Sequence, residues 1–116
     1  MTEPRVDVVA YEVSCLPADR IEAPVFTLRV ERRSVNPDRW CVSDGAFCYA
    51  LDGTTEYEPI PSSRTDKFKR KYWHRWDDAI ALAKRIAPTM SANGLSAGDL
   101  LARSTEPGTQ ANSPTG

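Results

Sequence analysis

The sequence predicts an α+β fold: an antiparallel four- to five-stranded sheet, built as a β-meander, then one packed helix and a short C-terminal helix. Apolar and polar residues alternate over the first half of the chain, two Asp-Gly pairs divide the meander, and an apolar stripe at helical spacing follows residue 76. With 116 residues, the chain suits one domain. We expect that domain over residues 1–103 and a disordered tail over residues 104–116, where no large apolar residue occurs.

Two strands are expected first, over residues 6–16 and 25–33. In the second, Phe26, Leu28 and Val30 alternate with polar side chains. If the edge of this strand were free, it could pair with a second copy of the chain.

The two Asp-Gly pairs predict tight turns of the meander, because glycine tolerates the positive φ of a type I′ turn. A loop at Asp44-Gly45 would place Cys41 opposite Cys48, and a loop at Asp52-Gly53 would place Cys48 opposite Tyr57. The face with the larger apolar area is the predicted core: Trp40, Val42, Phe47, Tyr49 and Leu51. The side chains of the other face are small and apolar enough for a helix to lie against them. They belong to Cys41, Ser43, Ala46, Cys48, Ala50 and Tyr57.

Residues 69–75 favour a short last strand, although the spacing of Phe68, Tyr72 and Trp76 also fits a helix. A helix over residues 77–87 follows, with Asp77 as its N-cap and Pro88 after its end.

The C-terminal part of the domain is predicted from two local signals. Asn93-Gly94 indicates a turn. Ser96 and Asp99 have the spacing of a capping box for a helix over residues 97–103.

Residues 64–76 concentrate positive charge next to aromatic side chains. They hold six Lys or Arg against one Asp, a net charge of +5, whereas the remaining nine basic and fifteen acidic residues give −6. Such a segment suits an acidic protein surface or a phosphate backbone. The candidate binding residues are Arg64, Lys67, Lys69, Arg70, Lys71, Trp73 and Arg75.

These observations favour a non-enzymatic module that binds a macromolecule, a protein in preference to nucleic acid, with Trp73 as the expected anchoring aromatic. Nucleic-acid binding through residues 64–76 is the alternative, and a structural or self-associating role is a further one. The sequence pI near 5.8 is low for a dedicated nucleic-acid binder.

No catalytic or cofactor motif is recognised, so we expect no enzyme activity, no cofactor and no metal. The single histidine, His74, is expected at the surface. Cys15, Cys41 and Cys48 are expected as reduced thiols in the core, although a zinc site with His74 or a Cys41–Cys48 disulfide would be possible. Without an apolar leader or membrane span, the protein is expected in the cytoplasm.

Dispersed positions carry a resemblance: Trp40-x-Val42, Cys48, Asp52-Gly53, Tyr57-Glu58-Pro59, Arg75-Trp76-Asp77-Asp78-Ala79 and Asn93-Gly94. In these the chain is similar to small uncharacterised proteins of actinobacteria and of phages that infect them. The similarity covers residues 11–103 and implies a bacterial or phage origin and a cytosolic setting. It implies no activity.

Overall fold

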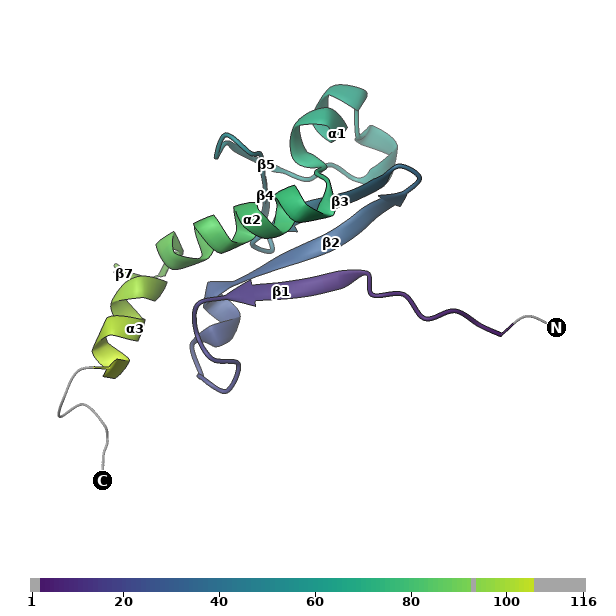
Figure 1. The fold of residues 1–116 in the computed structure, drawn as a ribbon. Helices are drawn as coiled ribbons and strands as arrows, with labels where there is room; N and C mark the ends of the chain where they lie inside the picture. Colours follow the sequence, from purple (N-terminus) through teal and green to yellow (C-terminus); the bar gives the residue numbers. More distant parts are fainter. Residues whose placement is uncertain (1–2, 93, 106–116) are drawn as a thin grey trace.

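The computed structural model describes residues 3–92 and 94–105. Its main element is an antiparallel sheet of five strands that lie in sequence order, from β1 to β5 (Figure 1). The predicted α+β class is therefore confirmed. The strands are β1 (Ala10–Ser14), β2 (Thr27–Val35), β3 (Asp38–Ser43), β4 (Phe47–Tyr49) and β5 (Thr55–Tyr57). The helices are α1 (Asp66–Tyr72), α2 (Trp76–Ile86) and α3 (Ala97–Thr105), and β6 (Ser91–Ala92) and β7 (Leu95–Ser96) form a second, two-stranded sheet.

Strand β2 lies inside the sheet, where it pairs with both β1 and β3. It begins later than predicted, because Pro24 lies in a 3₁₀ helix, η1 (Ala23–Phe26), immediately before it. The idea that this strand offers a free edge is therefore wrong. The two edges of the sheet are β1 and β5.

The first hairpin has a wider loop than the Asp44-Gly45 pair predicts. Ser43, not Cys41, lies opposite Cys48. The Asp44 carboxylate accepts hydrogen bonds from the backbone N–H groups of Ala46 and Phe47, at 2.9 and 2.8 Å, and so supports the longer loop. Because the register differs by two residues, each side chain keeps the face that was predicted for it.

The second hairpin differs from the prediction by one residue. Cys48 lies opposite Glu56, and Phe47 lies opposite Tyr57. The chain uses a three-residue connection in which Gly53 has a φ of 91°. Tyr57 therefore joins the face of Phe47, and their ring centroids are 4.4 Å apart.

The predicted core face packs under α2 through Trp40 and Val42, and Tyr49 is partly buried against the same cluster. Trp40 and Val42 are buried there together with Leu28 and Val30 of β2, against Leu82 and the small residues of α2. Leu51 instead remains 49% exposed. The meander is narrow, so α2 covers only part of this face.

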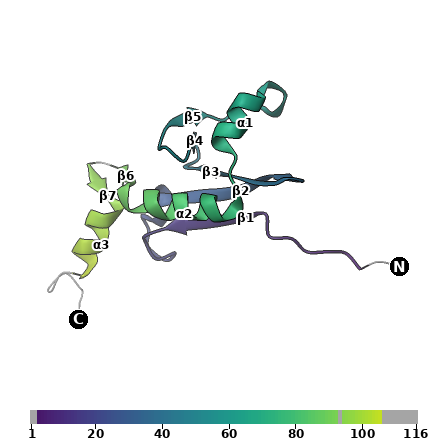
Figure 2. The same ribbon diagram turned by 45° about the horizontal axis from the view of Figure 1, so that its top comes forward.

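The opposite face of the meander is also buried. Cys41, Cys48 and Ala50 pack there against Phe68 and Tyr72 of α1. In Figures 1 and 2, α1 and α2 lie on different sides of the strands, which agrees with these two clusters. The small side chains of this face let a helix approach closely, as the sequence allowed.

Residues 66–72 form a helix and not the favoured strand. The four-residue spacing places Phe68 and Tyr72 on one side of α1, where both reach the sheet. Thr65 caps the helix by accepting a 3.0 Å hydrogen bond from the N–H of Phe68. Only Trp73–Arg75 is extended, and His74 forms an isolated antiparallel bridge with Trp40.

Replacing Thr65 with alanine is expected to lower the free energy of unfolding by about 1 kcal/mol, because the first turn of α1 loses its side-chain acceptor. Thr65→Ser keeps a hydroxyl at the cap and is expected to stay near wild type. Urea denaturation followed by circular dichroism measures both. Equal stability of the alanine and serine variants would show that the cap contributes nothing.

Helix α2 begins one residue before the predicted N-cap. Arg75 occupies the cap position without a side-chain hydrogen bond. Asp77 and Asp78 lie in the first turn, where their negative charges interact favourably with the positive end of the helix dipole. Trp76 belongs to the helix and its ring contacts that of Tyr11 at 5.9 Å between centroids.

The predicted capping box is confirmed. Ser96 Oγ accepts from the N–H of Asp99 at 3.0 Å, and the Asp99 carboxylate accepts from the N–H of Ser96 at 3.1 Å. Helix α3 includes Ser104 and Thr105, so the predicted tail starts too early, and its residues from 106 onward lie outside the described residues. Within the described part of the chain, no helix has the length and apolar character needed to cross a membrane.

Candidate binding surface around helix α1

Helix α1 presents its basic side chains away from the sheet. Lys67, Arg70 and Lys71 are exposed, and Arg75 is exposed just after the helix. This arrangement follows from the spacing of the buried residues, since Phe68 and Tyr72 point to the sheet and the cations between them point to solvent. Four of the seven predicted binding residues are therefore exposed, and one of them, Lys71, has its Nζ 5.7 Å from the ring centroid of Tyr72.

Arg64 has a structural position instead. Its Nε donates a 2.8 Å hydrogen bond to the carbonyl of Pro59, and its guanidinium lies 3.5 Å from the carboxylate of Glu58. Its side chain is only 18% exposed. These contacts tie the loop before α1 to the end of the meander.

The aromatic residues of the segment face inward. Phe68 and Tyr72 are buried with ring centroids 4.9 Å apart, and the Tyr72 hydroxyl donates to Glu56 at 2.9 Å. Trp73 is half-buried against the same cluster, and the Nζ of Lys69 lies 5.2 Å from its ring centroid. Lys69 is thus held as a cation over an aromatic face. Neither Phe68 nor Tyr72 can stack on a base without leaving the core.

A surface hollow of about 390 Å³ lies where α1 meets the start of α2. Arg39 of β3 joins it, although it is distant in sequence, because the Trp40–His74 bridge brings β3 beside the segment after α1. Four cations and two carboxylates line the hollow: Arg39, Arg70, Lys71, Arg75, Asp52 and Asp78. Trp73 also lines it.

One acidic residue at the rim is held ionised by its own turn. Hydrogen bonds from the Thr54 hydroxyl and N–H lower the pKa of Asp52, and the charge of Lys71 lowers it further. The hollow therefore retains a net excess of two positive charges at neutral pH, which suits an anionic ligand group.

His74 is buried, contrary to the expectation of a surface histidine. Its exposed fraction is 5%, its backbone exchanges two 2.7 Å hydrogen bonds with Trp40, and its Nε2 donates to the carbonyl of Tyr49 at 2.8 Å. The ring fixes the path of the chain between α1 and α2. It is thereby committed to a structural contact.

The zinc site considered from the sequence is not assembled. Among the described residues, the only cluster of three potential metal ligands is Cys41, Cys48 and Glu58, with ligand atoms within 4.8 Å of one another. Both Glu58 oxygens accept hydrogen bonds from Arg33 at 2.7 Å, so a cation there would compete with a guanidinium. The other two residues of the considered set, Cys15 and His74, lie outside this cluster.

Glu58 is the center of an ion cluster that the sequence analysis missed. Burial raises its pKa, but the hydrogen bonds and charge of Arg33, with the charge of Arg64, lower it below the ordinary value. Arg33 lies in β2, where the pairing with β3 is irregular, and Glu58 directly follows β5. Only the actual register shows that they meet.

Comparison with known proteins adds no relative: no protein-family model, curated protein or solved structure matches this chain.

Proposed function

We propose that this protein is a non-enzymatic binding module that recognises an acidic surface on another protein. The surface that would make the contact, called here the α1 surface, consists of the cations Arg39, Lys67, Arg70, Lys71 and Arg75. The observation that carries the proposal is the gathering of four of these cations around one hollow beside Trp73.

The orientation of the aromatic side chains favours a protein partner over single-stranded nucleic acid. Binding of single strands relies on exposed aromatic rings as stacking platforms, and Phe68 and Tyr72 are committed to the core. Guanidinium and ammonium groups around a hollow instead match Asp and Glu side chains that enter it. The chain's net charge of −1 further limits non-specific attraction to a phosphate backbone.

The α1 surface also suggests the kinetic character of the contact. Exposed charges mainly accelerate association, whereas a half-buried aromatic in the hollow slows dissociation. Trp73, which lines the hollow, would supply the latter.

The double variant Arg70→Glu/Lys71→Glu is expected to abolish capture of the partner from a lysate of the source cell. A matched control, Arg5→Glu/Lys84→Glu, changes the same two residue types at exposed positions away from α1 and is expected to bind normally. Capture is measured by quantitative mass spectrometry at low and at physiological salt. Equal capture by both double variants would refute the proposed surface.

A mobility-shift titration with mixed-sequence single- and double-stranded DNA separates the nucleic-acid alternative. The protein-binding proposal predicts no shift at physiological salt. A salt-dependent shift that Arg70→Glu/Lys71→Glu removes would assign the surface to phosphate binding instead.

A further inference from the structure

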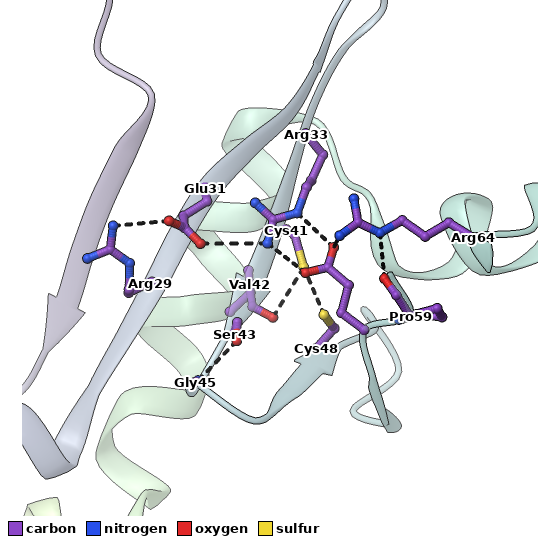
Figure 3. Close-up of polar contacts among 11 residues, drawn as sticks. Arg29, Glu31, Arg33, Cys41, Val42, Ser43, Gly45, Cys48, Pro59 and Arg64 are labelled. Atoms are coloured by element: carbon purple, nitrogen blue, oxygen red, sulfur yellow. Dashed lines mark hydrogen bonds and ion pairs between the residues drawn. The ribbon is translucent and has the colours of Figure 1, made fainter. Parts of the chain in front are cut away.

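A pair of buried thiols lies under α1, outside the α1 surface. Cys41 and Cys48 are 0% and 1% exposed, and their sulfur atoms are 3.1 Å apart, with the Cys41 thiol donating to the Cys48 sulfur. Figure 3 shows the two sulfurs pointing toward one another from β3 and β4. Cys15 packs in other clusters of the core.

This geometry is close to that of a covalent link. A disulfide has an S–S length of about 2.05 Å, so the sulfurs need to approach by about 1 Å. Both thiols lie on the same face of neighbouring strands, as diagonal neighbours, because Ser43 and not Cys41 is directly opposite Cys48. A bond between them would join β3 to β4 directly beneath Phe68 and Tyr72.

The surrounding charges distinguish the two thiols. The hydrogen bond from Cys41 lowers the pKa of Cys48 despite its burial, and Arg33 and Arg64 favour the thiolate while Glu58 opposes it. The same hydrogen bond, together with burial, raises the pKa of Cys41. Since the thiolate is the nucleophile, Cys48 is placed to react first and Cys41 to react second.

We propose that Cys41 and Cys48 are a redox site at which a small hydroperoxide, such as hydrogen peroxide, forms a reversible intramolecular disulfide. The Cys48 thiolate attacks one peroxide oxygen, the O–O bond breaks, and the products are Cys48 sulfenic acid and hydroxide. The Cys41 sulfur then attacks the Cys48 sulfur, the S–O bond breaks, and water leaves with the Cys41 proton. Overall the two thiols lose two electrons and two protons, and the peroxide is reduced to water.

Partly exposed side chains lie beside the buried sulfurs. Arg33, Glu58 and Arg64 lie next to them, and each of these side chains is 17–18% exposed. The neighbouring strand β5 is three residues long, forms an edge of the sheet and is exposed along its whole length. Such a short edge opens more readily than internal strands, and hydrogen peroxide is scarcely larger than water.

The test treats the full-length reduced protein with hydrogen peroxide, quenches the reaction, and alkylates the remaining thiols in denaturant. Peptide mapping by mass spectrometry is expected to find Cys41 joined to Cys48 in the wild type and in Cys15→Ser, and dithiothreitol is expected to restore both thiols. A Cys41→Ser variant is expected to retain Cys48 sulfenic acid, which dimedone traps, whereas Cys48→Ser is expected to give no such adduct at Cys41.

The wild-type mapping decides the matter even where a serine variant does not fold. The proposal is overturned if Cys41 and Cys48 are both recovered as alkylated thiols after a peroxide treatment that oxidises Cys15. It is also overturned if Cys48 proceeds to sulfinic acid while Cys41 stays a free thiol. Neither outcome bears on partner binding by the α1 surface.

Discussion

Replacing Leu28 with alanine is expected to lower the free energy of unfolding by about 3 kcal/mol, the middle of the range for buried leucines. Leu28 has no exposed surface and lies on the internal strand β2, within the cluster that α2 covers. Removing three carbon atoms there leaves a cavity between two packed layers, because the sheet and α2 cannot collapse onto it fully. Urea denaturation followed by tryptophan fluorescence measures the change.

Leu51→Ala is the matched control, since the same atoms are removed from a side chain that is 49% exposed. Its cost is expected to stay within about 1 kcal/mol. Similar losses for the two variants would contradict the assignment of the core to the face beneath α2.

Replacing Glu58 with glutamine is expected to destabilise the protein by about 2 kcal/mol at neutral pH, because Arg33 loses its bidentate charged acceptor while remaining largely covered. The two Arg33–Glu58 hydrogen bonds are 2.7 Å long, and both side chains are less than one-fifth exposed. The shape of the side chain is retained, so the change removes charge and one acceptor without opening a cavity. A double-mutant cycle with Arg33→Met isolates the interaction of the pair.

The pH dependence of stability gives a second measurement on the same residue. In the folded protein, burial raises the pKa of Glu58, but Arg33 and Arg64 lower it more. The pKa of Glu58 therefore lies below the ordinary 4.5. As the pH falls, the unfolded chain therefore takes up the proton first. The ionised Glu58 contributes its full amount to the free energy of unfolding above pH 4.5, and this contribution is lost as the pH falls through the pKa of the folded state. The stability difference between wild type and Glu58→Gln is expected to shrink over this acidic window. A difference that is constant from neutral to acidic pH would show that the carboxylate charge has no part in it.

The order and type of most elements follow from local chemistry that the sequence displays. The alternation around Leu28 and Val30 predicts an internal-facing strand, and the Ser96–Asp99 pair predicts the start of α3. Both signals act over a few residues, so no distant contact is needed to interpret them. The same holds for the inward-facing stripe of α2, which pairs small residues with Leu82.

Features that depend on distant contacts could not be predicted in this way. The α1 segment is compatible with a strand or a helix until Phe68 and Tyr72 find the small face of β3 and β4. Arg39 enters the basic hollow only because the Trp40–His74 bridge brings two distant segments together. Of the seven residues expected from the sequence, four are exposed, and Arg39 lies at the hollow beside three of those four.

The amino-acid sequence alone determined the fold class, the strand that contains Leu28 and Val30, the capped C-terminal helix and the place where positive charge gathers, because periodicity, caps and charge are properties of neighbouring residues. The tertiary structure decided the registers of both hairpins, including the diagonal placement of Cys41 and Cys48, the helical state of α1 and the structural positions of Arg64 and His74. The physical reason is that these features are chosen by packing. A loop that is one or two residues longer costs little by itself, and the burial of side chains from distant segments then selects the register.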